Sequence, residues 1–330
     1  MAERWSPDHL RLHRLLLSRP ALLPQGSPLL LAVSGGQDSM ALVGLLQDLA
    51  RLHHWSLALW HGDHRWRRES EQQAEALAAW AQQRQLPLTI DVWSDPQPGE
   101  AAARAWRYGR LSDQAQQAGV SRVVTGHTAS DRAETLLLRL ARGSHRRGLG
   151  SPQALRPLAD DLQLARPLLQ FSRAETARLC QELALPVWPD ASNDDPAYSR
   201  NRIRLEVLPV LEGLHPGASQ RICALSERLA EEEQAISELT DLALAPLIAP
   251  EPAGSLNRRA LMALAPANQR RLLQRWLEQS GLASLPSRSL DDLLQRLALT
   301  RGPGRQHLAG GRVLHWEWQR LWLAEGEQLP

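Results

Sequence analysis

The chain has 330 residues, of which 43% are hydrophobic and 22% are charged, and its formal net charge is +2. A chain of this length and composition can bury the core of one or two globular domains, which excludes a disordered or fibrous protein. No apolar run approaches the roughly 20 residues of a membrane span and no signal-peptide pattern is present, so we expect a cytoplasmic protein without a membrane partner.

An apolar run at residues 29–33 predicts a buried parallel strand, and residues 40–46 have the apolar spacing of a helix. At the start of a helix, backbone N–H groups and the helix dipole favour an anion such as phosphate. The turn between strand and helix is therefore the predicted nucleotide-binding loop. Its residues are Ser34, Gly35, Gly36, Gln37, Asp38 and Ser39.

Asp38 is unusual in a loop that binds phosphate, because a carboxylate repels phosphate unless a divalent cation lies between them. The common phosphate loop also needs a lysine, and all 38 basic residues of this chain are arginine. We therefore expect Asp38 to hold Mg²⁺ that bridges to the phosphates of a nucleotide. An ordinary glycine-rich turn in which Asp38 caps the helix is the alternative.

Strands and helices alternate through the rest of the first half. Strands are predicted at 56–61, 88–93 and 121–125, and helices at 69–84, 101–118 and 131–141. Four strand-and-helix units of this spacing imply an α/β fold with a doubly wound, Rossmann-like parallel sheet that binds ligands at the carboxyl ends of its strands. The segments 34–39, 61–64 and 126–127 follow those ends.

The second half differs, because helical periodicity dominates from about 219 to 299 and residues 311–323 alternate like a small β-hairpin. We predict a catalytic domain at 1–212 and a smaller helical domain at 213–330. Arginine-rich clusters suggest a local site for a polyanion, with solvated helix faces as the alternative. These clusters lie at 65–68, 145–147, 200–204 and 270–271.

His127, Asp131 and Glu134 follow the fourth predicted strand at spacings of four and three residues. If a helix begins near Ser130, both acids share one face near the first loop. Such a group can bind a metal or a ligand ammonium, although a capping box at Ser130 is the alternative. On the preceding helix, Arg107 has no acid at helical spacing and can reach an anion.

Taken in order, these motifs resemble those of the tRNA(Ile)-lysidine synthetases, in their short form, within the N-type ATP pyrophosphatase superfamily. The matching segments lie at 34–39, 100–108, 125–134, 142–144, 166–169 and 190–204. The last of them, DASNDDPAYSRNRIR, discriminates this family from its relatives. The chain departs from the pattern at Thr128 and Ser130, where the family usually has His and an acid, and at 61–64, which read His-Gly-Asp-His.

The resemblance implies an ATP-dependent ligase that acts on the wobble cytidine of tRNA(Ile) with a CAU anticodon. ATP adenylates the oxygen on carbon 2 and releases pyrophosphate, and free L-lysine then displaces AMP to form lysidine. In this interpretation the loop and its hydroxyls hold the pyrophosphate, and Mg²⁺ on Asp38 neutralises it with help from Arg107 or Arg139.

The same resemblance implies roles for the other motifs. Asp131 and Glu134 are candidates to receive the cationic end of lysine, and His127 is a candidate for proton transfer. Candidates for contact with the tRNA are Asn193, Arg200, Asn201 and Arg204. The sequence leaves the oligomeric state open, with a homodimer among the options.

Three alternative functions remain open at this point. A tRNA-thiolating relative would need reactive cysteines, whereas Cys180 and Cys223 form no CxxC pair and are expected to be buried small hydrophobes. A ligase similar to GMP or NAD synthetase would share the ATP chemistry but would not need basic clusters beyond the sheet. A non-catalytic RNA-binding relative would have lost activity through Thr128 and Ser130.

Overall fold

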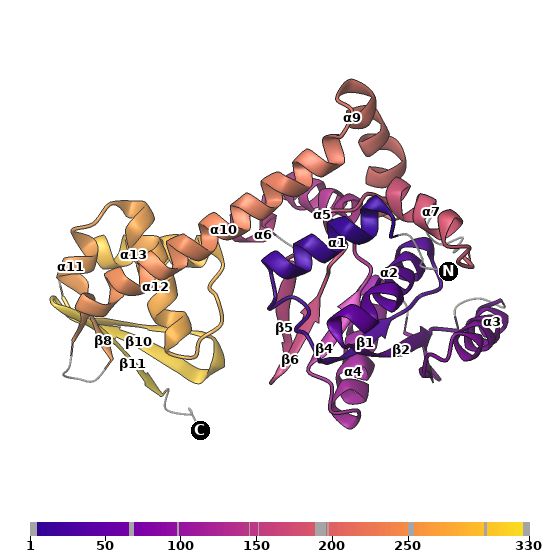
Figure 1. Cartoon of the computed structure of the whole chain (residues 1–330). Coiled ribbons are helices and arrows are strands. Elements are labelled where there is room, and N and C mark those ends of the chain that lie inside the picture. Colours follow the sequence, from indigo (N-terminus) through magenta and orange to yellow (C-terminus); the bar gives the residue numbers. More distant parts are fainter. Residues whose placement is uncertain are drawn as a thin grey trace. The chain divides into compact units, whose positions relative to one another are not determined.

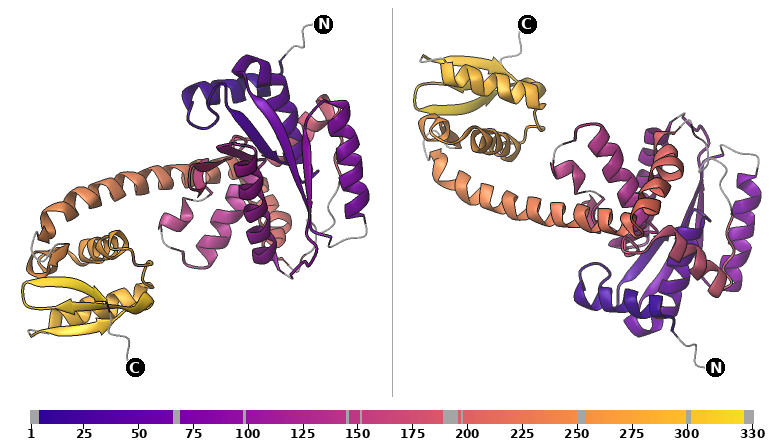
Figure 2. Two further views of the ribbon diagram at one scale, coloured as in Figure 1. Left: turned by 90° about the horizontal axis from the view of Figure 1, so that it is seen from below. Right: turned by 90° about the horizontal axis from the view of Figure 1, so that it is seen from above.

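The computed structural model describes residues 5–65, 69–97, 99–144, 146–150, 152–188, 196, 198–249, 254–299 and 302–325. The chain divides into two compact units, Met1–Glu231 and Glu232–Pro330 (Figures 1 and 2). Each unit has its own hydrophobic core. Within the described ranges, every helix is too short or too polar to cross a membrane.

The first unit is built on a mostly parallel sheet whose described strands follow the order β3-β2-β1-β4-β6-β5 (Figure 1). The strands are β1 Pro28–Ala32, β2 Ser56–Asp63, β3 Leu88–Val92, β4 Arg122–Thr125, β5 Leu155–Ala159 and β6 Leu162–Ala165. Only β5 runs antiparallel to its neighbour among these strands. Because β1 and β4 are adjacent and parallel, the loops that follow them meet at one edge of the sheet.

Helices cover both faces of this sheet. They are α1 Pro7–Ser18, α2 Gln37–His53, α3 Ser70–Gln83, α4 Glu100–Gln117, α5 Ala129–Ala141, α6 Arg146–Leu149 and α7 Arg173–Glu182. Leu29 and Leu31 of β1 pack with α1, α2 and α7, whereas Leu30 packs in a separate core with α4. Side chains alternate along a strand, so a fully apolar strand is buried on both sides. The predicted doubly wound α/β fold is confirmed.

One local prediction needs correction. β2 continues to Asp63, two residues past the predicted end at His61, so most of the motif at 61–64 lies inside the strand rather than after it. Gly62 permits this extension, because a Cβ there would lie 2.5 Å from the ring of Trp60. The β5–β6 hairpin was not predicted; it turns at Asp161, whose φ is 57°.

After α7, residues 199–214 form one helix with a wide central turn. Its parts are α8 Ser199–Arg202, a π-helical turn at Ile203–Val207 and α9 Leu208–Leu214. Pro209 has no N–H to donate to the carbonyl four residues earlier, and the N–H of Leu208 donates to Ile203, five residues earlier. The next helix, α10 Ala218–Leu244, begins in the first unit and ends in the second.

The second unit has an antiparallel sheet in the order β7-β8-β11-β10-β9. Its strands are β7 Ile248–Ala249, β8 Ser255–Asn257, β9 Gly304–His307, β10 Arg312–Trp316 and β11 Arg320–Glu325, and its helices are α11 Arg258–Met262, α12 Pro266–Gln279 and α13 Ser287–Leu299. Leu314, Trp316 and Leu321 pack against α12 and α13. The predicted terminal hairpin is confirmed as β10–β11, but the sheet around it was not predicted.

Candidate active site

The predicted nucleotide loop connects β1 to α2. Gly35 has a φ of +87°, and a Cβ there would lie 3.2 Å from the ring of Trp188, so the position favours glycine. Gly36 is the N-cap of α2 and receives no side-chain cap. Ser39 Oγ donates to the Gly36 carbonyl at 2.8 Å and lies 3.2 Å from Ser34 Oγ. The loop thus presents backbone N–H groups and hydroxyls at a helix start, which suits phosphate.

Gly126 holds the loop after β4 against the nucleotide loop. A Cβ at this position would lie 2.7 Å from the carbonyl oxygen of Asp38 and 3.0 Å from the Cα of Ser39. Two backbones can approach this closely only where no side chain intervenes. The first and fourth strand motifs therefore meet at the carboxyl edge of the sheet, as the topology predicts.

Asp38 lies in the first turn of α2 and contacts α7. Thr176 Oγ1 donates to Asp38 Oδ1 at 2.5 Å, and Arg173 Nη1 lies 4.0 Å from Oδ2. Burial and the nearby charge of Asp131 raise the pKa of Asp38, although Thr176 and Arg173 partly oppose them. A raised pKa means that the ionised carboxylate is disfavoured at this position, so a bound cation would stabilise it. The contributions of Thr176 and Arg173 were not predicted, because they depend on the packing of α7 against α2.

The two carboxylate oxygens of Asp131 have different partners. Its Oδ2 accepts from the backbone N–H of Thr128 at 2.8 Å and from the Thr128 hydroxyl at 2.9 Å, which forms a capping box. α5 therefore starts at Ala129, with Thr128 as N-cap, and the alternative cap at Ser130 was wrong. The other oxygen, Oδ1, accepts from Arg200 Nη2 at 2.7 Å.

Glu134 lies one turn along the same face of α5, fully buried, and holds two arginines. Arg200 Nε donates to Glu134 Oε2 at 2.7 Å, and Arg204 donates to both carboxylate oxygens. Burial alone would raise the pKa of Asp131, but Arg200, His127 and Thr128 together lower it. The predicted shared face of the two acids is confirmed, and it carries positive partners from α8 and the π-helical turn.

His127 is half-buried beside this cluster, and Thr125 Oγ1 lies 2.9 Å from its Nδ1. Burial lowers the pKa of His127 to about 3, and Arg166, Arg200 and Arg104 oppose protonation further, despite Asp131. The imidazole is therefore neutral near pH 7 and can accept a proton only from a strong local donor.

Tyr108 lies within the same positive surroundings. Arg104 and Arg156 approach its ring at 5.0 and 5.1 Å. Burial would raise the pKa of Tyr108, but Arg104, Arg166 and Arg156 lower it. Arg166 was predicted only as part of the motif at 166–169, and Arg156 belongs to none of the motifs.

Arg107 lies at the edge of this region. Its Nη2 lies 3.3 Å from His64 Nε2, and its charge contributes to lowering the pKa of His61, for which burial is the main cause. Arg139, the other candidate for the pyrophosphate, donates to the Gly148 carbonyl. Asn201 is buried, and Asn193 lies outside the described residues.

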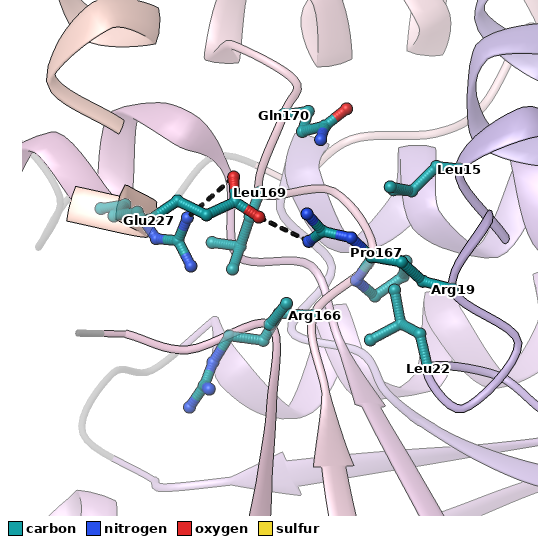
Figure 3. A pocket seen from close by; sticks show the side chains of 10 residues that line it. Leu15, Arg19, Leu22, Arg166, Pro167, Leu169, Gln170 and Glu227 are labelled. Atoms are coloured by element: carbon teal, nitrogen blue, oxygen red, sulfur yellow. Dashed lines mark hydrogen bonds and ion pairs between the residues drawn. The ribbon is translucent and has the colours of Figure 1, made fainter. Parts of the chain in front are cut away.

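The start of α10 is fastened to the first unit by charge (Figure 3). Glu227 accepts from Arg19 at 2.5 Å and lies 3.8 Å from Arg132. Nearby, Cys223 donates to the Leu169 carbonyl. Both cysteines are buried, as predicted, and burial raises the pKa of both thiols, that of Cys180 to about 11.

Both units of the chain match known protein families. Residues 10–211 match the family described as PP-loop domain, and residues 256–322 match the TilS substrate binding domain. The chain is 53% identical to a tRNA(Ile)-lysidine synthase from Parasynechococcus marenigrum, over 98% of this chain and 96% of that protein. A tRNA(Ile)-lysidine synthase from a Synechococcus species is 44% identical, over 96% of this chain and 97% of that protein.

The fold is also similar to a solved structure, the U34-tRNA thiolase NcsA from Methanococcus maripaludis. The TM-score is 0.58, with 68% of this chain and 78% of that chain covered. Since the two sequences are only 18% identical, this likeness concerns the fold alone.

Proposed function

The chain belongs to the tRNA(Ile)-lysidine synthase family, and we propose that it uses ATP to join free L-lysine to the wobble cytidine of tRNA(Ile) with a CAU anticodon. The oxygen on carbon 2 attacks the α-phosphorus of ATP and pyrophosphate leaves. The side-chain amine of lysine then attacks carbon 2, loses a proton, and AMP leaves. The observation that supports this assignment best is the close approach at Gly126, which brings the nucleotide loop beside the motif that carries Asp131 and Glu134.

We propose that the loop residues bind the phosphates of ATP and that Asp38 binds Mg²⁺. Mg²⁺ in nucleotide sites is held by one or two carboxylates together with phosphate oxygens and water. Asp38 fits this chemistry, because burial and the charge of Asp131 raise its pKa, and a cation would offset both effects. When bound, the metal would supply positive charge to the departing pyrophosphate. Arg107 is proposed to add to that charge.

We further propose that Asp131 and Glu134 receive the ammonium of lysine. Arg200 contacts both carboxylates, which supports a site for an extended cationic group at this position. Lysine would take the place of Arg200 on Asp131, while Arg204 continues to neutralise Glu134. His127, neutral and adjacent, is proposed to accept a proton when the amine attacks.

For the tRNA, we propose contacts through Asn193, Arg200, Asn201 and Arg204. Arg200 and Arg204 hold carboxylates in this structure, so they would reach the RNA only by giving up one of those bonds.

We propose catalysis in 1–212 and tRNA holding in 213–330. Truncation after Glu231 tests this division better than truncation at the 212/213 boundary, because it keeps Cys223 and Glu227 of α10, which bind the first unit. The shortened chain should bind ATP but form little lysidine. We also propose a cytoplasmic location, where ATP, lysine and tRNA are all present. All proposed site residues come from one chain, and this is compatible with a homodimer.

The direct test is incubation with ATP, Mg²⁺ and labelled lysine, together with either tRNA(Ile) or the methionine tRNA that shares the CAU anticodon. We expect lysidine in digests of tRNA(Ile) alone, with Asp38→Asn as the inactive control. Pyrophosphate release without any labelled nucleoside would contradict the proposal and favour a different ATP-dependent ligase.

A further inference from the structure

The sheet of the second unit has one face against helices and one face away from them (Figure 1). Leu314 and Trp316 of β10 and Leu321 of β11 belong to the core on the helix side. Because side chains alternate along a strand, the intervening positions share the opposite face, which we call the outer face. In β9, β10 and β11 its polar and aromatic members are Arg305, His307, His315, Arg320 and Trp322.

An aromatic pair occupies the middle of the outer face. His315 pairs with Arg305 of β9 on one side and with Trp322 of β11 on the other, so the three residues form a row across three strands. The rings of His315 and Trp322 are stacked, with centroids 5.4 Å apart and an interplanar angle of 15°. Arg320 Cζ lies 5.4 Å over the Trp322 ring. A half-buried ring flanked by guanidinium groups suits a π-stacked ligand that carries negative charge.

The charged side chains at the strand positions of this face are arginines. None of the outer-face positions in the described strands is Asp or Glu. The one acid of β11, Glu325, pairs with Arg312 and belongs to the helix side of the sheet. An acid does approach from the turn, where Glu317 lies 3.2 Å from Arg320. In the same turn, Trp318 is 57% exposed.

The three arginines of α12 all hold carboxylates. Arg270 pairs with Asp291, Arg271 with Glu233, and Arg275 with Asp241. An arginine that already holds a carboxylate must break that bond before it can bind phosphate. The predicted basic cluster at 270–271 is therefore a weaker site for RNA than the outer face, where Arg320 pairs with Glu317 in the same way but Arg305 lies among described strand positions without an acid.

We infer that the outer face binds an unpaired nucleobase of the tRNA, stacked on Trp322 and His315, with Arg305 and Arg320 on the flanking phosphates. This inference rests on the proposed function for the identity of the RNA. Stacking on an aromatic ring accepts any base, so the site would add affinity rather than read a sequence. Arginine beside the ring would make that affinity dependent on salt.

The test uses the full-length chain and tRNA(Ile) with a CAU anticodon, in filter binding across a salt series. Trp322→Leu keeps an apolar side chain but removes the ring, and we expect Kd to rise about 5- to 100-fold. Trp322→Phe should restore most of the affinity, and Arg305→Gln should reduce the salt slope by about 0.7. Arg270→Gln is the matched control on α12 and should bind as the wild type does.

Wild-type affinity in both Trp322→Leu and Arg305→Gln would overturn the inference, as would a larger loss in Arg270→Gln. If Trp322→Leu does not fold, ultraviolet cross-linking of the wild-type complex decides: a nucleotide on the β10–β11 peptide supports the site, and cross-links confined to other peptides refute it. Lysidine formation is measured separately. In one outcome the wild-type chain binds tRNA but forms no lysidine, while Trp322→Leu still weakens tRNA binding. That result would reject the proposed function and support the outer face as an RNA-binding surface.

Discussion

Arg204 donates two hydrogen bonds to Glu134, from Nε to Oε1 at 2.7 Å and from Nη2 to Oε2 at 3.0 Å. Glu134 is fully buried, whereas the Arg204 side chain is 15% exposed. This two-pronged pair neutralises a carboxylate inside the first unit and attaches the helix at 199–214 to α5.

Removal of that carboxylate should destabilise the first unit. Glu134→Ala leaves Arg200 and Arg204 without their shared partner, and we expect a loss of about 3 kcal/mol, the lower end for breaking a buried ion pair, because both guanidiniums can still reach water. Urea unfolding measures the change. Glu206→Ala is the control, since Glu206 forms an exposed pair with Arg202 and should leave the midpoint unchanged. Equal midpoints for both variants would contradict a stabilising role for Glu134.

A milder change tests lysine recognition. Glu134→Gln keeps the shape of the side chain but removes its charge, so we expect the KM for lysine to rise more than the KM for ATP. Steady-state rates with each substrate varied in turn separate the two effects. If the KM for lysine and kcat both stay at wild-type values, the amino-acid site lies elsewhere.

Asp38→Asn tests the proposed metal site. The change removes the negative charge but should leave tRNA binding intact, because no tRNA contact is proposed for Asp38. Loss of one well-placed electrostatic group typically slows a reaction about 10²–10³-fold. Pyrophosphate release under single-turnover conditions measures the step, and release at a near-normal rate would refute a role for the metal at Asp38.

The same substitution should stabilise the fold at neutral pH. Burial and Asp131 raise the pKa of Asp38, so the folded chain binds this proton more tightly than the unfolded chain, and ionisation lowers the free energy of unfolding. We expect Asp38→Asn to have the higher Tm at pH 7. The advantage should disappear as the pH falls below about 4, where the wild-type carboxyl is protonated in both states. Calorimetry from pH 3 to pH 8 follows the difference, and a lower Tm for the variant at pH 7 would show that the bonds from Thr176 and Arg173 dominate.

The cysteines should be chemically inert. Burial raises the pKa of Cys180 to about 11 and also raises that of Cys223, so little thiolate forms at pH 8. We expect a thiol reagent to label the native protein slowly and the urea-unfolded protein at both cysteines. The variants Cys180→Ala and Cys223→Ala should retain lysidine formation. Loss of activity after selective labelling of the native protein would instead favour thiol chemistry.

Strong local patterns predicted most of the first unit. The run at 29–33 and the helical periodicity after it are long enough to indicate a buried strand and its helix. β5 and β6 are as short as β1 and β4, which were predicted, but β5 contains Arg156 and Pro157 and neither strand has the unbroken apolar run of β1 or the β-branched residues of β4, so their sequence gives no strand signal. In the second unit, β7, β8 and β9 have only two, three and four residues, and β8 pairs with β11, more than 60 residues away in sequence.

The site shows the same limit. The spacing of Asp131 and Glu134 predicted their shared face, because helical geometry is local. Their partners Arg200 and Arg204 were expected to face the tRNA, and their contact with α5 depends on tertiary packing across more than 60 residues. Thr176 approaches Asp38 in the same way, from a helix 138 residues away.

The wide turn at Ile203–Val207 makes the length of this segment as important as its composition. Each residue added to or deleted from a helix rotates everything beyond it by about 100°. An insertion or deletion between Arg200 and Arg204 would therefore turn one guanidinium away from Glu134, whatever residue was involved. In evolution, the number of residues between these two arginines should therefore stay constant even where a residue between them changes.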